Sequence, residues 1–290
     1  LFALLIILSM LITSVGFADD GTMFRKNVSK TPDLETERAN LNHMSFYVPA
    51  QAADGTVLIE GIDYYKVDGT LFENRLYAKP LVAVYIDSLA HEEELGSGGA
   101  GIGAHDAYAA VSLDDGATWK DTNLSNSAHL SSFTGSAPGV NQGIPFPGDA
   151  HNMTFAIAGD KVLVGWISKY CDGGSPLYTM LDADVDALQL ATGLPDLYVR
   201  DIWGVAGTQK SVDYTLQGYP DVGEIPYSCV WSARGQLLPI IETVDESETV
   251  VGYDIVWTKA ERLTSGRRDA NRLEMNGDSA AGFMMTWQED

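Results

Sequence analysis

The sequence predicts an all-β protein. Its hydrophobic runs are short, rich in Val, Ile, Tyr and Trp, and bounded by Gly, Asp or Pro, as is typical of strands separated by turns. Two of these runs flank Gly159-Asp160, and this arrangement predicts a hairpin. Sustained helical periodicity is absent; only Asp182–Leu190 suits a short helix or turn. Strands are predicted at Leu76–Asp87, Tyr108–Ser112, Met153–Ala158, Lys161–Ser168, Leu197–Val205, Tyr227–Ala233, Val250–Thr258 and Ala281–Gln288.

Residues 1–18 have the layout of a secretory signal peptide. An apolar run is followed by Gly16-Phe17-Ala18, with small residues at the −3 and −1 positions, and then by Asp19-Asp20. The run is short for a membrane helix, which needs about 20 apolar residues. We therefore expect an exported protein, extracellular, at the cell surface or periplasmic, with no transmembrane span in the mature chain.

The remaining chain divides into an irregular segment, 19–42, and one β domain, 43–290. No initiator Met or basic segment precedes Leu1, and the last predicted strand has no closing partner, so we expect a sequence incomplete at both ends. The chain has 40 acidic and 18 basic residues, a net charge of −22. This charge opposes binding to nucleic acid or to anionic membranes and favours divalent cations such as Ca²⁺. In an exported chain, the two cysteines Cys171 and Cys229 are expected to form a disulfide.

The octapeptide Ser112-Leu-Asp-Asp-Gly-Ala-Thr-Trp119 is the most specific local motif. The carboxylates of Asp114 and Asp115 are expected to fold back onto following backbone N–H groups, while Gly116 takes a positive φ. Thr118 and Trp119 then restart a strand, with the indole beneath the turn. The motif resembles the Asp-box of sialidase-like β-propellers, which implies a structural hairpin clasp remote from any binding site.

Longer segments resemble the exported bacterial family of choice-of-anchor O proteins. They include Pro147–Gly159, Val164–Cys171, Arg200–Gly207, Arg262–Asp269 and Thr286–Asp290. The resemblance implies a sialidase-like β-propeller attached to the cell surface by a tail beyond residue 290. Trp166, Trp231, Trp257 and Trp287 recur at irregular spacings that suit successive blades. We expect four to five blades here and six in a complete propeller; a single large β-sandwich is the alternative.

A sialidase needs three arginines that converge on the substrate carboxylate, a Tyr–Glu pair and an acidic proton donor. The chain has few arginines and one clear Asp-box, so we favour a binding or scaffold protein whose ligand is an extracellular glycan or protein. A sialidase-type glycoside hydrolase is the first alternative. The residues predicted to bind a ligand are Arg200, Arg262, Arg267, Arg268 and Asp269. The arginines among them are expected to form a clamp for an anionic group.

An extracytoplasmic metal-binding protein is the second alternative. Imidazole groups in one loop-rich region suit Zn or Cu, and carboxylates on alternate residues suit a loose Ca²⁺ site. Scattered loop residues without metal are the competing interpretation of both sets. The predicted metal ligands are His105, His129 and His151 in the first set, and Asp182, Asp184 and Asp186 in the second.

Overall fold

The computed structural model describes the chain in several stretches. Its regular secondary structure consists almost wholly of β-strands. The described residues are 27–30, 36–88, 104–172, 186–187, 189–191, 193, 208–244 and 247–290. The predicted signal peptide and the predicted strand at Leu197–Val205 lie outside them. Within the described residues, no helix has the length and apolar character needed to cross a membrane. The all-β prediction is confirmed.

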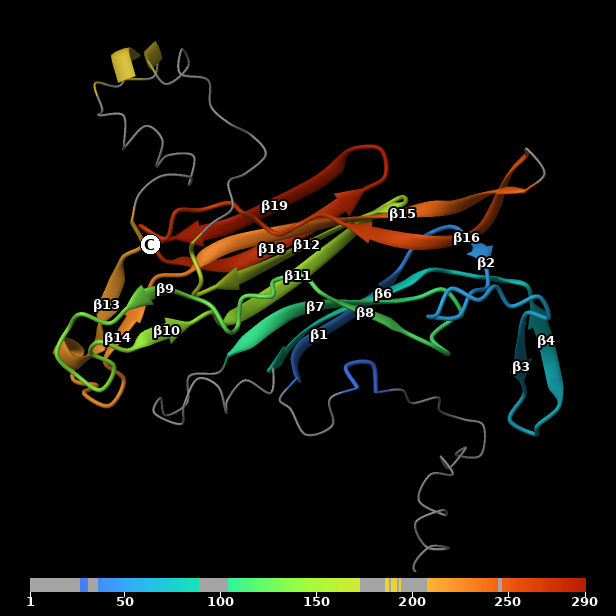
Figure 1. The fold of residues 1–290 in the computed structure, drawn as a ribbon, viewed down its shortest axis with the longest axis horizontal. Helices are drawn as coiled ribbons and strands as arrows, with labels where there is room; N and C mark the ends of the chain where they lie inside the picture. The colour runs from blue at the N-terminus through green and yellow to red at the C-terminus, as the bar shows by residue number, and fades with distance from the viewer. Residues whose placement is uncertain are drawn as a thin grey trace, which may run out of the picture.

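Two antiparallel sheets form the body of the protein (Figure 1). Sheet 1 has the order β1-β6-β7-β8 and sheet 2 the order β11-β12-β15-β16, with the short β17 also paired to β15. The strands of sheet 1 are β1 (Thr36–His43), β6 (Leu81–Ser88), β7 (His105–Ser112) and β8 (Lys120–Asn123). The strands of sheet 2 are β11 (Ala150–Ala158), β12 (Lys161–Ser168), β15 (Cys229–Val244), β16 (Ser247–Trp257) and β17 (Glu261–Arg262).

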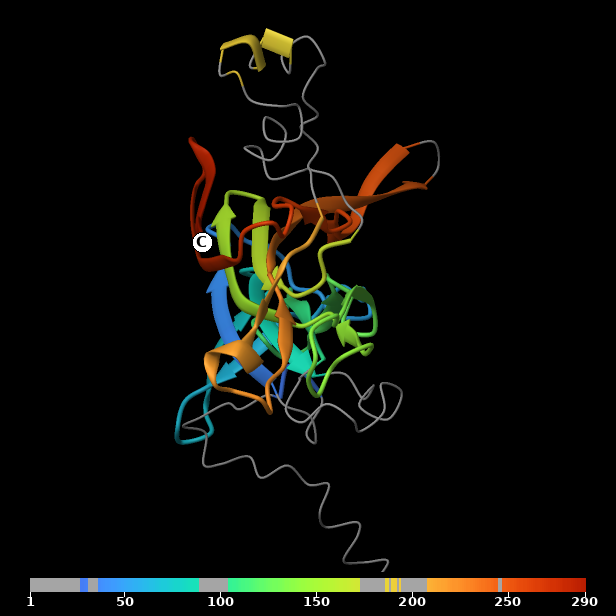
Figure 2. The same ribbon diagram turned by 90° about the vertical axis from the view of Figure 1, so that its left-hand side faces the viewer.

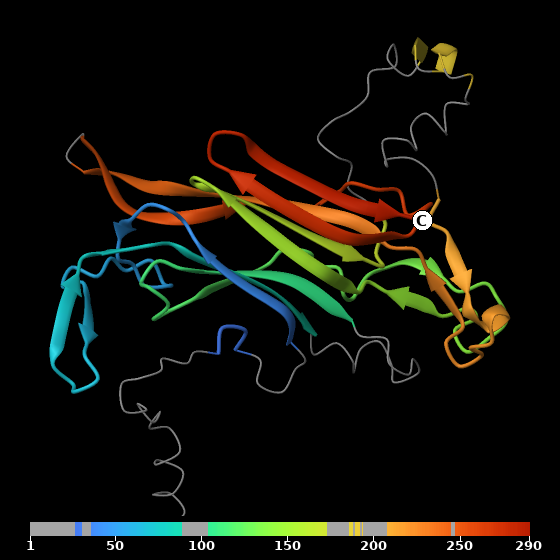
Figure 3. The same cartoon turned by 180° about the vertical axis from the view of Figure 1, so that it is seen from behind.

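A third layer and several small hairpins complete the fold. The hairpin of β18 (Ala270–Asp278) and β19 (Gly282–Glu289) lies over the side of sheet 2 that faces away from sheet 1 (Figures 1 and 3). Short pairs are β2 (Val48–Pro49) with β5 (Tyr77–Ala78), β3 (Ile62–Tyr65) with β4 (Leu71–Arg75), β9 (Ser131–Thr134) with β10 (Pro145–Pro147), and β13 (Ser211–Asp213) with β14 (Glu224–Pro226). The 3₁₀ helix η2 spans Tyr214–Gln217.

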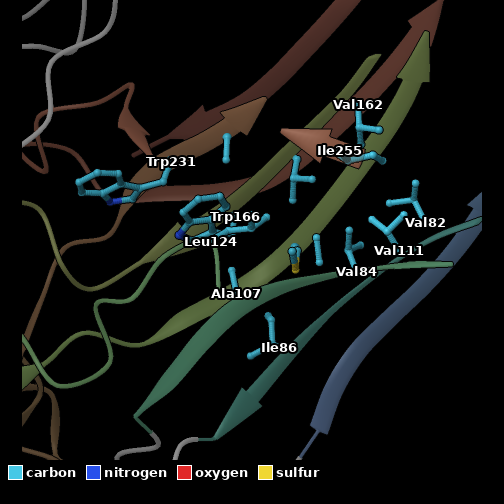
Figure 4. Packing of buried hydrophobic residues seen from close by; sticks show 14 of the residues in the cluster. Val82, Val84, Ile86, Ala107, Val111, Leu124, Val162, Trp166, Trp231 and Ile255 are labelled. Atoms are coloured by element: carbon cyan, nitrogen blue, oxygen red, sulfur yellow. The ribbon is translucent and has the colours of Figure 1, made fainter. Parts of the chain in front are cut away.

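The main core lies between the two sheets because strand side chains alternate between faces. Val82, Val84 and Ile86 of β6 point toward Val162 and Trp166 of β12, and all are nearly fully buried (Figure 4). Burying each such side chain contributes about 1.5–3 kcal/mol of transfer free energy. Face-to-face packing of these residues fixes sheet 1 against sheet 2.

The other face of sheet 2 packs against the β18–β19 hairpin at Gly165. A Cβ built on this glycine would lie 2.9 Å from Met285 Cε and 3.0 Å from Leu273 Cδ2. Ile167 and Val230 are buried on the same face with Leu273. At one end of the molecule, β7, β11 and β18 begin and β12 ends, so all three layers contribute strand ends there. Figure 2 looks onto this side.

Two expectations about organisation change once the strands are placed. β1 occupies Thr36–His43, so regular structure begins before residue 43. All eight of its residues are exposed, so it lacks the apolar alternation that signals a strand and forms by backbone pairing with β6.

The tryptophan spacing does not mark successive blades. Trp166 and Trp231 are direct cross-strand partners, and Trp257 lies on β16 of the same sheet. Only Trp287 belongs to the β18–β19 hairpin. The described residues form two large antiparallel sheets, this hairpin and four short strand pairs. The blade number and the closure of a propeller stay predictions.

Candidate functional site

The strand ends at one end of the molecule bring together charged groups from three layers. Asp149 and Asp269 directly precede β11 and β18, Lys169 directly follows β12, His105 begins β7 and His151 lies in β11. We call these five residues the polar strip. Gly148, next to Asp149, lets the backbone before β11 pass close to the backbone of Ser127. A Cβ at this position would lie 2.1 Å from the carbonyl oxygen of Ser127. The strip thus forms because strands of the two sheets and of the β18–β19 hairpin have their ends side by side.

Asp149 joins two histidines. Its carboxylate lies 2.7 Å from His105 Nδ1, and its backbone carbonyl lies 3.3 Å from His151 Nδ1. The His105 and Asp149 side chains are only 14% and 26% exposed. A carboxylate at this distance orients the imidazole. The pair therefore presents a fixed imidazole at the boundary between sheets 1 and 2.

Lys169 and Asp269 continue the strip from sheet 2 to the β18–β19 hairpin. The Lys169 ammonium donates to the carbonyl of Pro226 at 3.0 Å and lies 4.0 Å from the Asp269 carboxylate, which accepts from Ser228 N at 2.7 Å. Burial lowers the pKa of Lys169. Burial, and to a lesser extent the neighbouring Lys169 charge, lowers the pKa of His151.

The described arginines predicted as an anion clamp are held by protein groups. Arg262 donates to the carbonyl of Cys171, and Arg268 Nε lies 2.6 Å from the Glu289 carboxylate. Arg267 also has a partner in the protein, and Arg200 lies outside the described residues. These contacts place Arg262 at the disulfide and Arg268 against β19, next to the strip.

The predicted disulfide is present and supports the same end of the molecule. Cys171 and Cys229 form a disulfide bond and are 58 positions apart in the sequence. The bond links the segment after β12 to the start of β15. Gly266 has φ +75° and passes over the bridge, where a Cβ would lie 2.9 Å from Cys171 Sγ. Trp231 donates its indole N–H to the carbonyl of Tyr170, adjacent to Cys171, at 2.8 Å.

The Ser112–Trp119 turn lies at the opposite end of β7 from His105. Asp114 is 2% exposed; its carboxylate accepts from Thr118 N at 2.8 Å and from Thr118 Oγ1 at 2.6 Å. Trp119 donates to the carbonyl of Gly116 at 3.0 Å, beneath the turn as predicted.

Asp115 differs from the expectation for this turn. Its carboxylate accepts from Tyr64 OH and Lys79 N rather than from the following backbone. Thr118 Oγ1 also accepts from Ala53 N at 2.7 Å. The turn thus ties the 51–79 region to sheet 1, which is a structural task.

The predicted metal ligands do not form one group. His105 and His151 meet at Asp149, whereas His129 is exposed in the loop between β8 and β9. Over the described parts of the chain, no three His, Cys, Asp or Glu residues come together in a way that could hold a metal ion. Asp182 and Asp184 lie outside those parts, and Asp186 is exposed.

Asp149 and Lys169 are the strip residues that the sequence analysis did not select. Lys169 directly follows the predicted strand Lys161–Ser168, so a search for charged residues at the ends of predicted strands would have found it. Asp149 directly precedes β11, which begins before the predicted run at Met153, so the same search would have missed it. Their proximity depends on how the sheets stack, which no local pattern contains.

No protein-family model matches the chain, and no curated protein matches it. Among solved structures, it is similar to a Trypanosoma rangeli sialidase in complex with sialic acid, at 12% identity and a TM-score of 0.32, over 89% of this chain and 35% of that chain. A mutant of that sialidase displaying trans-sialidase activity matches at 11% identity and a TM-score of 0.32, over 86% of this chain and 31% of that chain. The chain thus spans about a third of the length of the structures that it matches. Likeness at this level carries no argument, so the fold description rests on the strands and sheets.

Proposed function

We propose that this chain is part of an exported, surface-attached β-propeller that binds an extracellular glycan at the polar strip. The observation that supports the proposal is the alternation of hydrogen-bond acceptors and donors along the strip. Asp149 and Asp269 supply carboxylate acceptors, Lys169 supplies an ammonium donor, and the histidines supply imidazole nitrogens within the same row. Sugar hydroxyl groups both donate and accept, so adjacent hydroxyls suit a site that offers both.

The rigidity of the strip supports binding as well. Four of its five side chains come from strand ends or the residues that adjoin them, and the disulfide ties one of those ends, that of β12, to the start of β15. A site fixed before the ligand arrives loses less conformational entropy on binding. The net charge of −22 favours an uncharged polar ligand or one bound with a cation over a polyanion.

The test is a glycan array probed with the purified protein and with a double variant of the strip, Asp149→Asn with Lys169→Met. We expect the wild-type protein to bind at least one glycan and the double variant to lose about tenfold or more in affinity. Asp54→Asn with Lys66→Met makes the same two chemical changes in exposed loops at the other end of the molecule and serves as the control. Equal binding by both double variants would contradict the proposal.

The same protein distinguishes the alternatives. Incubation with a sialoside, with and without Ca²⁺, tests a sialidase-type hydrolase, because turnover that is lost in Arg262→Ala or Arg268→Ala would make the chain an enzyme. Retention of a protein ligand rather than any glycan would place it among protein-binding scaffolds. Ca²⁺-dependent binding would reveal a cation at the site.

A further inference from the structure

The paired ends of β15 and β16 form a two-stranded arm that extends beyond the rest of sheet 2 (Figures 1 and 3). Pairing of β12 with β15 stops at Gln236, whereas β15 and β16 stay paired as far as Val244 and Ser247. β16 is the last strand of the sheet order in the described part of the chain. The arm therefore has a backbone edge along β16 and a second along β15 beyond Gln236. We define the arm as the described residues of the two strands, Leu237–Val244 and Ser247–Asp254.

The base of the arm is fixed by a side chain from another part of the fold. The amide of Gln51, which is 5% exposed, donates to the carbonyl of Tyr253 at 2.8 Å and accepts from Tyr253 N at 2.8 Å. Gln51 thus satisfies the β16 edge at this one residue, in the way that a neighbouring strand would. Beyond it, toward the tip, the edge runs from Ser247 to Val251.

The arm exposes apolar side chains that a two-stranded ribbon alone does not protect. Ile241 and Val250 are cross-strand partners and are 53% and 50% exposed. Leu238 and Ile240 are 39% and 40% exposed. Isolated two-stranded ribbons are at best marginally stable in water, so a partner that covers these side chains stabilises the arm.

The charge of the arm selects the partner. From Leu237 to Trp257 the sequence has five acidic residues and no Lys, Arg or His. Two arms of this kind repel each other, and Pro239 leaves the β15 edge without a backbone N–H donor at that residue. On β16, Val251 has no partner on β15 and forms a bulge, so the regular part of the β16 edge ends at Val250. A second copy of the chain is therefore disfavoured, whereas a basic chain is attracted.

We propose that the arm is a docking site for an extended, basic segment of another protein. The segment adds as a strand to β16 between Ser247 and Val251, where main-chain hydrogen bonds fix its register. Its apolar side chains lie on the face that carries Ile241 and Val250, and its Lys or Arg residues lie on the opposite face, which carries Glu242. This site is distinct from the polar strip, which lies at the other end of sheet 2.

The test uses a fluorescent peptide of alternating Lys and Val and measures its fluorescence anisotropy with the purified chain. Two comparison peptides have alternating Glu and Val, or the same Lys and Val content in two blocks. We expect binding of the alternating Lys peptide only, weaker at high salt. We also expect slower hydrogen–deuterium exchange of the amides in 247–251 when it is bound, because strand addition protects them.

Two charge-reversal variants separate the arm from the overall charge. Glu242→Lys with Glu248→Lys is expected to weaken binding of the peptide about tenfold, because it turns two negative charges beside the docking edge into positive ones. Asp221→Lys with Glu274→Lys makes the same charge change away from the arm and is expected to bind like the wild type. Circular dichroism checks that all variants fold. The proposal is overturned by absence of binding, by equal loss in both variants, by binding without protection of 247–251, or by self-association through the arm in ultracentrifugation.

Discussion

Replacement of Asp114 by Ala tests whether the Ser112–Trp119 turn stabilises the fold. The Asp114 carboxylate is 2% exposed and accepts hydrogen bonds from Ser112 Oγ at 2.8 Å, Thr118 N at 2.8 Å and Thr118 Oγ1 at 2.6 Å. Hydrogen bonds to a charged group contribute about 1.5–3 kcal/mol each, but the two hydroxyls can rotate to other acceptors. The backbone N–H of Thr118 cannot, so we expect a loss of about 3 kcal/mol in the free energy of unfolding.

The assay is urea unfolding followed by tryptophan fluorescence, with the midpoint and the slope fitted separately. Asp54→Ala is the control, because Asp54 lies in an exposed loop and its carboxylate contacts Thr56, two residues away, in the same loop. We expect this control to leave the midpoint unchanged. A loss below about 1 kcal/mol for Asp114→Ala would refute the view that this carboxylate holds the turn.

Three further predictions concern the core, the disulfide and the strip. Gly165→Val is expected to cost about 1–3 kcal/mol, measured by urea unfolding, because its Cβ would lie 2.9 Å from Met285 Cε; an unchanged midpoint would contradict the packing of β19 on sheet 2. Replacing both Cys171 and Cys229 by Ala is expected to cost about 4 kcal/mol for a 58-residue separation, and thermal unfolding that is insensitive to this change would contradict the account. Burial lowers the pKa of His151 below its ordinary value of 6.5, so the unfolded state binds the proton more readily and stability falls as pH drops below 6.5; His151→Gln should show a shallower loss in unfolding at matched pH values.

The strands and the hairpin turn were predictable because their signals are local. β12 follows Gly159-Asp160 and coincides with the predicted run, and the predicted runs at 153–158 and 250–258 fall on β11 and β16. β1 was not predictable, because its exposed side chains carry no alternation and its stability comes from pairing with β6.

The site was predictable only in part. His105, His151 and Asp269 were selected from the sequence as residue types that suit a ligand or a metal. Asp149, which joins the two histidines, gave no signal because its role depends on the stacking of sheet 1 on sheet 2. The tryptophan spacing failed for the same reason, since Trp166 and Trp231 face each other within one sheet.

The most direct test of the account is calorimetric titration of the strongest array glycan into the wild-type protein and into Asp149→Asn with Lys169→Met. The glycan is recovered afterwards and analysed for cleavage. The account predicts saturable binding by the wild type, recovery of intact glycan, and about tenfold or greater loss of affinity in the double variant. Unchanged affinity in the variant, or recovery of hydrolysed glycan, would contradict a binding site at the polar strip.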